Sequence, residues 1–431
     1  MTQTNLLDEL MWRGLVHQTS DDALARAAFA GQTSAYIGFD PTGTSLHVGS
    51  LLQILTLVRL QRAGHRAIAL VGGGTGLIGD PSGKSAERTL LTADIVRSNG
   101  DAIRDQLARF LDFEGSNPAQ LVNNVDWLNG VGLLAFLRDV GKHFSVNAMV
   151  QRDSVRTRLE GRNQGISYTE FSYMLLQAYD FLALYRDHGC QAQMGGSDQW
   201  GNMVSGTDLI RRAGLSDVGQ PFAVTSPLIT TRAGTKFGKT EKGAVWLDPE
   251  RTSPYAFYQF WLQTEDTDVG PYLRYFTFMA RDEIEALEAA HTEAPHQRSG
   301  QRALAEAVTR FVHGDAALAQ AQRATAVLFT GDVEGVPAAT LEQIFADVPS
   351  ASVTRADLDA ADWAVRTFLV GDALPFASSG EAKKALKAGS VRINGVRLQA
   401  DPNARFDTLI EDHLAVVRVG KKRYHLVRIV N

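Results

Sequence analysis

The chain has 431 residues, of which 44% are hydrophobic and 21% charged, and a formal net charge of −5. These values are ordinary for a globular protein of two or three domains, and no apolar run of about 18 residues predicts a transmembrane helix. The N-terminus lacks the apolar segment of a secretory signal. The single cysteine, Cys190, excludes an intramolecular disulfide framework, and no Cys/His spacing indicates a metal site, so we expect a cytoplasmic protein.

The first half of the chain alternates strand-like and helix-like segments. An apolar run at 35–39 precedes a helical pattern at 48–63, and a second apolar run follows at 67–71. Strand, helix and strand in this order predict a βαβ unit, and therefore an α/β domain built on a parallel sheet. The further predicted helices lie near 92–113, 168–186 and 202–213, and the further predicted strands near 121–124 and 191–194.

The second half of the chain has a different pattern. Residues 253–329 are helical and poor in strand signals, and residues 330–360 contain clusters of Gly, Pro, Ser and Thr. Residues 361–431 carry 12 Lys and Arg against 7 Asp and Glu, although the whole chain is acidic. A basic module on an acidic body suggests contact with a polyanion, but a solvated basic surface explains the charge equally well.

A polar loop follows the first predicted strand and leads into its helix. It runs from Asp40 to Ser50 and includes His47 and Gly49. Ligands of open α/β sheets bind at the carboxyl ends of the strands, and a helix N-terminus there presents free N–H groups to phosphate. The loop therefore indicates a phosphate site, with His47 as a donor. An isolated histidine at a helix start is more often a cap or a solvated residue.

Two other loops lie in equivalent places after predicted strands. Residues 72–84 contain six glycines, and residues 195–202 contain Asp198 and Gln199, which could orient a ribose or an amino acid. A glycine-rich loop suggests a ligand cradle lined by backbone, but the spacing is not that of the common phosphate loop or of the dinucleotide fingerprint. Each loop, taken alone, is also compatible with ordinary turn and cap chemistry.

Polar residues also lie on one face of the predicted helix 168–186. Tyr173, Gln177 and Asp180 are spaced i, i+4 and i+7, which places them on the same side of an otherwise apolar helix. Such a stripe either faces solvent or lines a pocket.

Further along, Lys236 and Lys239 lie three residues apart, with a glycine between them. Such a cationic loop can close over a transferring phosphoryl group, or it can be a simple exposed loop.

Together these segments resemble the bacterial tyrosyl-tRNA synthetases, a class I aminoacyl-tRNA synthetase family. The motifs that carry the resemblance are Tyr36-Ile-Gly-Phe-Asp-Pro-Thr42, His47-Val-Gly-Ser50, Tyr173-Met-Leu-Leu-Gln-Ala-Tyr-Asp180, Gly195-Gly-Ser-Asp-Gln-Trp-Gly-Asn202 and Lys236-Phe-Gly-Lys-Thr240. Residues 381–395, a predicted helix followed by an Asn-Gly turn between two strand-like runs, resemble an S4 RNA-binding module. The resemblance covers almost the whole chain, and five motifs occur in the family's order.

The resemblance implies roles for individual residues. Those implied to bind tyrosine are Tyr36, Asp80, Tyr173, Gln177, Asp180 and Gln199, with Asn124 supporting the pocket. Those implied to bind ATP are Asp40, His47, Gly49, Ser50, Asp198 and Lys239. Those implied to act on the phosphates in catalysis are Thr42, His47, Lys84, Arg88, Lys236 and Lys239. Candidates for RNA contact are Lys383, Lys384, Lys387 and Arg392.

The implied reaction needs no enzymic nucleophile, because the tyrosine carboxylate attacks ATP itself. The resemblance implies that ATP is a substrate, that Mg²⁺ arrives with ATP, and that no cofactor is tightly bound. The implied partners are tRNA(Tyr) and a second copy of the chain, which forms a homodimer with the first. A pocket that bonds a phenol rejects phenylalanine, and tyrosyl-tRNA synthetases are themselves the known example, with discrimination of about 10⁵ without editing. The motif His47-Val-Gly-Ser50 departs from the usual HIGH sequence at Ser50, where a hydroxyl replaces an imidazole as an ATP contact.

The expected organisation has four parts. These are a Rossmann-like catalytic domain at 1–232, the 236–240 loop with a helical anticodon-binding domain at 233–345, a linker at 346–360, and an α+β S4 domain at 361–431. Two other functions are compatible with parts of the sequence. A tryptophan enzyme of the same class is disfavoured by Tyr36 and Asp180, and an RNA-binding protein without catalysis is disfavoured by His47, Lys236 and Lys239.

Overall fold

The computed structural model describes the chain as two compact units, Met1–Asp248 with Glu265–Gly300, and Pro249–Thr264 with Gln301–Asn431. The residues outside the description are 1–4, 83–89, 153–154, 157–158, 160–165, 216, 230–236, 241–242, 347 and 421–422. Three expected site residues, Lys84, Arg88 and Lys236, therefore lie outside the described residues. In the part of the chain that is described, every helix is too short or too polar to cross a membrane.

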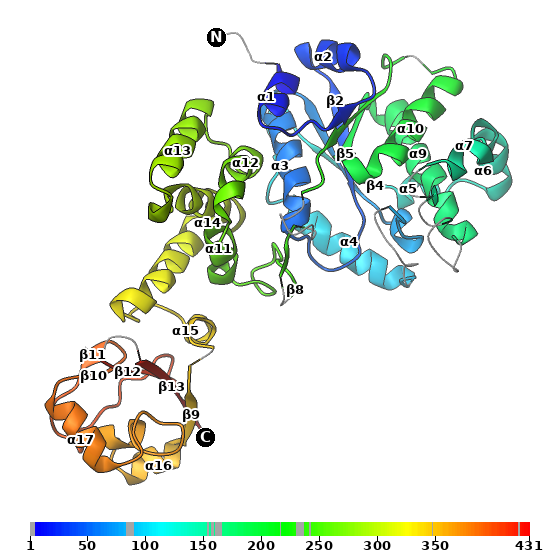
Figure 1. The fold of residues 1–431 in the computed structure, drawn as a ribbon. Helices are drawn as coiled ribbons and strands as arrows, with labels where there is room; N and C mark the ends of the chain where they lie inside the picture. Colours follow the sequence, from blue (N-terminus) through cyan, green and yellow to red (C-terminus); the bar gives the residue numbers. More distant parts are fainter. Residues whose placement is uncertain are drawn as a thin grey trace. The chain divides into compact units, whose positions relative to one another are not determined.

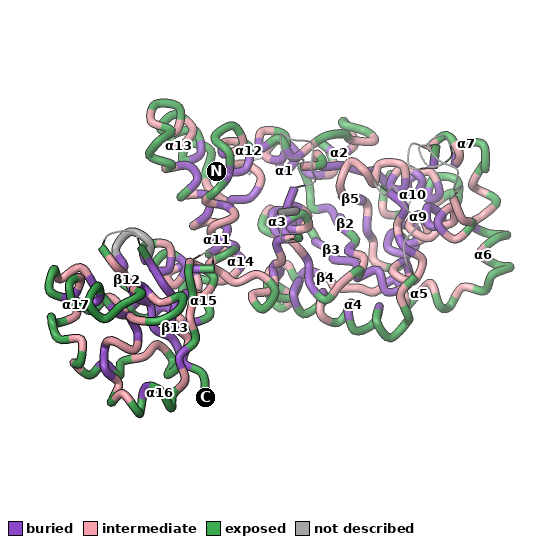
Figure 2. The backbone as a smooth tube through the Cα atoms, turned by 60° about the horizontal axis from the view of Figure 1, so that its bottom comes forward, coloured by how far each residue is buried: buried purple, intermediate pink, exposed green. Residues whose placement is uncertain are grey.

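The first unit is built on a six-stranded sheet with the order β1-β6-β5-β2-β3-β4 (Figure 1). Its strands are β1 (Gln18–Thr19), β2 (Ser34–Phe39), β3 (Arg66–Val71), β4 (Gln120–Asn123), β5 (Ala192–Gly196) and β6 (Phe222–Ser226). Strands β2 to β6 pair in parallel, and β1 pairs antiparallel with β6. The predicted parallel sheet is confirmed. Figure 2 shows why its central strands read as unbroken apolar runs, since β2 and β3 are buried along most of their length.

Helices connect these strands and cover the sheet. They are α1 (Leu6–Trp12), α2 (Asp22–Ala30), α3 (Val48–Arg62), α4 (Ala93–Leu107), α5 (Val125–Leu128), α6 (Leu133–Asp139), α7 (Val146–Val150), α9 (Tyr168–His188) and α10 (Trp200–Arg212). Two more helices belong to this unit, α12 (Asp266–Phe276) and α13 (Arg281–Glu293). The long helix α9 begins where the Ser167 hydroxyl accepts a hydrogen bond from the Glu170 N–H and ends at Gly189, whose φ of 63° is left-handed.

The second unit combines helices with a five-stranded sheet of order β11-β10-β12-β13-β9. Its helices are α11 (Pro254–Leu262), most of α14 (Ser299–Thr330), α15 (Ala338–Ile344), α16 (Arg355–Ala360) and α17 (Ser379–Lys387). Its strands are β9 (Ser350–Thr354), β10 (Val391–Ile393), β11 (Val396–Arg397), β12 (Leu414–Val419) and β13 (Arg423–Val430). Residues 346–360, expected as a linker, thus hold β9 and α16, and β9 pairs in parallel with β13.

The predicted Asn-Gly turn lies between β10 and β11. Asn394 has a φ of 49° and Gly395 a φ of 80°, and a two-residue hairpin turn of this type needs positive values at both positions. The Asn394 side chain fixes the turn to its neighbours, because its Nδ2 donates to the Thr408 carbonyl at 2.7 Å and its Oδ1 accepts from the Val416 N–H at 2.8 Å.

Candidate active site

A cavity of about 460 Å³ lies at the carboxyl ends of β2, β3 and β5. Because these strands are parallel neighbours, the loops that follow them meet at one edge of the sheet. The expected site residues that line the cavity are Tyr36, Asp40, Thr42, His47, Gly49, Ser50, Asp80, Tyr173, Gln177, Asp180, Asp198 and Gln199. The fold therefore brings together residues that are up to 163 positions apart in the sequence, from Tyr36 to Gln199.

Two buried side chains, Tyr36 on β2 and Asp180 on α9, offer a donor and an acceptor inside the cavity. Each is 1% exposed, and among the described residues the Tyr36 hydroxyl has no hydrogen-bond partner. The Asp180 carboxylate accepts from Asn124 Nδ2 at 2.9 Å and from Trp127 Nε1 at 2.8 Å. Burial raises the pKa of Asp180 to about 7, against these two hydrogen bonds and with a further contribution from the charge of Asp40. A ligand hydroxyl would complete both groups.

Asp40, at the end of β2, ties three segments of the site together. Its Oδ1 accepts from the Thr75 hydroxyl and its Oδ2 from the Tyr173 hydroxyl, both at 2.7 Å. Thr75 in turn accepts from Asn124 Nδ2 at 2.9 Å, and Asn124 Oδ1 accepts from the Gly74 N–H at 2.7 Å. Burial, followed by the charge of Asp40, holds the pKa of Tyr173 well above its usual range. The glycine-rich loop after β3 is thus anchored to the cavity by side chains.

A second polar cluster surrounds Asp80. Its Oδ2 accepts from Gln199 Nε2 at 2.6 Å, and its Oδ1 accepts from the Ser82 N–H at 2.9 Å. Asn202 Nδ2 donates to Gln177 Oε1 at 2.9 Å and so orients that amide. Burial raises the pKa of Asp80 to about 6, and the Ser82 hydrogen bond opposes the rise. A carboxylate beside amide oxygens suits an ammonium group.

The start of α3 forms the more open side of the cavity. His47 is the N-cap of α3, and its Nδ1 accepts from the Gly49 N–H at 3.0 Å. A neutral imidazole that accepts at Nδ1 carries its proton on Nε2, which is therefore a donor. Thr42 and Gly49 are exposed and line the same cavity. The first N–H groups of α3 already have partners, since Val48 donates to the Val245 carbonyl and Ser50 to the His47 carbonyl. An imidazole N–H and a hydroxyl at the positive end of a helix dipole are suited to phosphate.

The 236–240 loop reaches this side of the cavity through the residues that are described. Phe237 and Gly238 line the cavity. The backbone of Lys239 lies in β7 (Lys239–Thr240), which pairs antiparallel with β8 (Gly243–Ala244). The position of the Lys239 side chain is outside the description.

Sequence reasoning missed three residues that contribute to the cavity. Gln193 on β5 is 4% exposed and lines the cavity, and its Oε1 has no partner among the described residues. Thr75 and Trp127 hold Asp40 and Asp180. The sequence did carry a signal for Gln193, because it is a polar residue between the apolar Ala192 and Met194 of a buried strand. It carried none for Trp127, which contacts Asp180 only through the tertiary fold.

The candidate RNA-binding residues lie on the second unit. Lys383, Lys384 and Lys387 are exposed on α17, whose buried residues are Ala382 and Leu386. Arg392 is exposed on β10 and donates to the Gly395 carbonyl at 2.9 Å. These four cations, called the basic face below, belong to one small domain.

Family comparisons cover nearly the whole chain. The family described as tRNA synthetases class I (W and Y) matches residues 30–330, and the Tyrosine--tRNA ligase SYY-like C-terminal domain matches residues 340–427. The Tyrosine--tRNA ligase of Geobacillus kaustophilus is 51% identical over 428 residues, which cover 98% of this chain and 99% of the relative. Tyrosine--tRNA ligase 1 of Bacillus subtilis is 50% identical over 429 residues, with 98% and 99% covered.

Solved structures give the same result for the fold. The C-terminally truncated mitochondrial tyrosyl-tRNA synthetase of Aspergillus nidulans superposes with a TM-score of 0.69 at 32% identity, over 76% of this chain and 94% of that one. A tryptophanyl-tRNA synthetase of Encephalitozoon cuniculi, bound to tryptophan, superposes with a TM-score of 0.53 over 73% of this chain and 87% of that one. At 13% identity the second similarity concerns the fold alone.

Proposed function

The chain belongs to the class I tRNA synthetases of the tryptophan and tyrosine group, and from this premise we propose how it works as a tyrosine–tRNA ligase. Its substrates are L-tyrosine, ATP and tRNA. The choice of tyrosine within the group rests on one observation, the buried pair of Tyr36 and Asp180. Among the described residues the Tyr36 hydroxyl has no hydrogen-bond partner. A phenolic O–H donates to the Asp180 carboxylate and accepts from Tyr36, whereas phenylalanine leaves both groups unpaired.

The other end of tyrosine is held by the second polar cluster. The substrate ammonium donates to Asp80, to Gln177 Oε1 and to the Tyr173 oxygen, whose own proton is already directed at Asp40. Gln199, bonded to Asp80, lies near the substrate carboxylate. Tyrosine is thereby fixed at both ends before ATP reacts, which reduces the entropy that the reaction must lose.

ATP binds on the open side of the cavity. His47 Nε2–H and Thr42 contact its phosphates at the positive end of the α3 dipole. Gly49 and Ser50 leave room for the adenosine, and Asp198 accepts from the ribose. When Mg²⁺ is bound to the phosphates of ATP, it would supply charge neutralisation there. The residues whose positions or side chains lie outside the description, Lys84, Arg88, Lys236 and Lys239, are proposed to reach the leaving pyrophosphate.

The first step is a displacement at the α-phosphorus. A carboxylate oxygen of tyrosine forms the new P–O bond, the bond to the bridging oxygen of the β-phosphate breaks, and pyrophosphate leaves with the electron pair. The chain contributes positioning and stabilisation of developing charge. In the second step a hydroxyl at the 3′ end of tRNA attacks the tyrosyl carbonyl, its proton is released, and AMP leaves.

We assign the remaining parts to tRNA and to a second copy of the chain. The helical domain within 233–345 would meet the anticodon, and the S4-like domain at 361–431 would contact tRNA phosphates through the basic face, with the reaction taking place in the cytoplasm. Helix α6 supports a homodimer. Figure 2 shows this short helix as largely exposed, and its Leu133, Leu134 and Leu137 are 72%, 81% and 43% exposed. A Leu134→Glu variant should lower the mass measured by light scattering from that of a dimer to that of a monomer; an unchanged dimer would show that the interface lies elsewhere.

The deciding experiment is exchange of labelled pyrophosphate into ATP with each of the twenty amino acids and no tRNA. Exchange with tyrosine alone is expected. Exchange with tryptophan instead would retain the family and reject the Tyr36 and Asp180 assignment. If folded protein gives no exchange with any amino acid, the RNA-binding alternative is favoured. In that case ATP and tyrosine together would raise the melting temperature no more than either ligand alone.

A further inference from the structure

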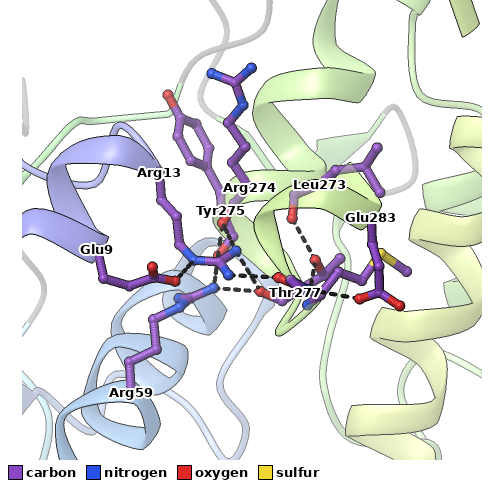
Figure 3. A network of polar contacts seen from close by, with 10 residues as sticks. Glu9, Arg13, Arg59, Leu273, Arg274, Tyr275, Thr277 and Glu283 are labelled. Carbon is purple, nitrogen blue, oxygen red and sulfur yellow. Dashed lines mark hydrogen bonds and ion pairs between the residues drawn. The ribbon is translucent and has the colours of Figure 1, made fainter. Parts of the chain in front are cut away.

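Helix α12 is attached to the rest of the first unit by two arginines, which bind at its carboxyl end. The last carbonyls of a helix have no partner within the helix. Here the Thr277 hydroxyl donates to the Leu273 carbonyl at 2.6 Å, Arg13 donates to the Arg274 carbonyl at 3.0 Å, and Arg59 donates to the Tyr275 carbonyl at 2.9 Å (Figure 3). The end of α12 is therefore closed by side chains from elsewhere in the unit.

The two arginines reach further along the same segment. Arg13 also donates to the carbonyls of Thr277 and Met279, at 3.2 and 2.8 Å, and Arg59 also donates to that of Thr277, at 2.8 Å. Arg59 is 5% exposed, and burial, followed by the charge of Arg13, lowers its pKa to about 9. It stays cationic at neutral pH, where the negative end of the α12 dipole favours it. Since Arg59 belongs to α3, α12 is fixed to the helix whose first turn forms the phosphate side of the cavity.

The same helix holds the described part of the loop, residues 237–240, through aromatic contacts of Phe237. Phe237 is 8% exposed, stacks on Phe276 with ring centroids 5.3 Å apart, and meets Tyr272 edge-on at 5.0 Å. Tyr272 and Phe276 themselves meet edge-on at 5.7 Å. Such pairs contribute beyond the area they bury, and they have a preferred geometry. Phe237, which lies between the two lysines of the loop in the sequence, thus packs on α12.

The next residue brings the loop against the start of α3. Gly238 has a φ of 82°, and a Cβ added there would lie 2.5 Å from Val48 Cγ2 and 3.3 Å from the Gly49 N–H nitrogen. The Gly238 carbonyl accepts from the Val245 N–H at 3.0 Å, and the Val245 carbonyl accepts from the Val48 N–H at 2.9 Å. Helix α3 is thus connected to the loop in two ways. The first turn of α3 contacts the loop at Gly238, and Arg59 of α3 binds α12, on which Phe237 packs.

We propose that Phe237 and Arg59 are positioning residues that fix the described part of the loop, residues 237–240, at the phosphate side of the cavity, Phe237 by packing on α12 and Arg59 by holding α12 to α3. This inference rests on the proposed function and adds to it two residues outside the expected site. Arg59 does not line the cavity, and the Phe237 ring packs on Phe276 and Tyr272 of α12. Their contribution is to bring the loop's lysines to the same place in each reaction cycle.

The proposal predicts a specific kinetic pattern. If Phe237 positions lysines that act on the leaving pyrophosphate, its loss slows adenylate formation and leaves the tyrosine pocket intact. If Phe237 is merely part of the core, its loss acts through stability, and any buried phenylalanine of the unit should behave in the same way. Phe29 on α2 is such a residue, because it is 3% exposed and packs edge-on against Phe222 at 5.6 Å and His65 at 5.3 Å.

The experiment compares Phe237→Leu with Phe29→Leu in the full chain. For each, the single-turnover rate of tyrosyl-adenylate formation, the tyrosine Kd by equilibrium dialysis, and the melting temperature are measured. Phe237→Leu should slow adenylate formation about three- to tenfold, the range that loss of an aromatic pair corresponds to, with the tyrosine Kd within about twofold of the unmodified value. Phe29→Leu should lower the melting temperature at least as much and leave the rate unchanged.

Arg59 is tested in parallel by Arg59→Met and Arg59→Lys. Arg59→Met should slow adenylate formation by about 2- to 30-fold, a usual range for residues that act through a packed element, and Arg59→Lys should recover part of the rate because it keeps the charge at the end of α12. The proposal is overturned if Phe237→Leu slows the reaction no more than Phe29→Leu, or if the tyrosine Kd rises by the same factor as the rate falls. Absence of tyrosine-dependent exchange in the unmodified chain would instead reject the proposed function.

Discussion

The cavity of the first unit and the basic face of the second differ in how their polar groups are held. In the cavity, Asp180 is 1% exposed and both of its oxygens accept hydrogen bonds from neighbouring side chains. On the basic face, Lys383, Lys384 and Lys387 are exposed on the surface of α17. Buried groups act at short range in a low dielectric, whereas exposed charges act over about 8 Å at physiological salt and are weakened by more salt.

This difference has consequences for single substitutions. A buried hydrogen-bonded pair has no solvent to replace a lost partner, so one change in the cavity should have a large effect that does not depend on salt. An exposed cation contributes a small part of a shared field, so changes on the basic face should be small, additive and salt-dependent. The predictions below test these expectations, from the largest expected effect to the smallest.

The largest effect is expected for Asp180→Asn. The amide would direct an N–H at the donors of Asn124 or Trp127 and would lose the charge that accepts the phenol. Breaking such a buried pair costs about 2–5 kcal/mol, so kcat/KM for tyrosine in pyrophosphate exchange should fall about 30- to 5,000-fold. The matched control is Asp187→Asn on the same helix, an exposed residue paired with Arg186 at 2.6 Å, which should be nearly silent. Equal losses in the two variants would contradict the role of Asp180.

A large effect is also expected from pH alone. The pKa of Asp180 is raised to about 7 and that of Asp80 to about 6, and the ionised form of each group accepts from tyrosine more strongly than the protonated form. Tyrosine affinity should therefore fall as pH drops below about 7, by up to about tenfold per pH unit for each group that becomes protonated. The Kd measured by fluorescence between pH 5 and 8 tests this. A constant Kd over that range would contradict it.

The stability of the free protein should change in the opposite direction. Because both carboxyl groups have pKa values above those of the unfolded chain, the folded state binds their protons more tightly. The contribution of these two groups to the free energy of unfolding without tyrosine should therefore be greater near pH 4 than near pH 7. It should decrease as the pH rises, and it should be lost once the pH has passed about 6 for Asp80 and about 7 for Asp180. The Asp80→Asn variant should lose the part of this dependence that Asp80 contributes, which lies between the ordinary pKa of about 4 and the raised pKa of about 6.

An intermediate effect is expected for Tyr36→Phe. The hydroxyl has no partner among the described residues, so its removal should cost substrate binding and leave the fold intact. One hydrogen bond of about 1.4 kcal/mol corresponds to about a tenfold loss in kcat/KM for tyrosine. Tyr185→Phe is the control with the reverse pattern, because the buried Tyr185 hydroxyl donates to the Gly219 carbonyl at 2.7 Å. It should lower stability by about 1 kcal/mol and leave tyrosine kinetics unchanged. A Tyr36→Phe variant that loses stability but not activity would contradict the assignment.

The same contrast explains what the sequence could predict. The βαβ pattern and the position of Asp40, Asp80 and Asp198 after strands followed from periodicity, because parallel strands must end at one edge of the sheet. Asp180 could be placed on a helix face, but spacing alone did not decide between solvent and pocket. The partners that hold it, Asn124 and Trp127, are more than 50 residues away, as their separations of 56 and 53 positions show.

Long-range pairing also explains the differences in the second unit. Strand β9 lies in a segment rich in Ser and Thr that resembles a linker locally, and only its pairing with β13, about 76 positions later, makes it part of the sheet. The docking of Phe237 on α12 was equally invisible, since it joins two segments with no shared periodicity. Turn chemistry was more reliable, because the Asn394-Gly395 dipeptide specifies its own backbone angles.

The smallest effect for each residue changed is expected on the basic face. In a Lys383→Ala, Lys384→Ala, Lys387→Ala triple variant, the slope of log K for tRNA against log salt should become shallower by about 2 to 3, because each phosphate contact releases about 0.7–0.9 of a counterion. Adenylate formation without tRNA should not change. The control is Arg428→Ala, since Arg428 is already paired with Glu342 at 2.6 Å and its removal should leave the slope as it is. An unchanged slope in the triple variant would show that tRNA meets another surface. The contrast between the cavity and the basic face would then no longer describe how this chain recognises tyrosine and tRNA.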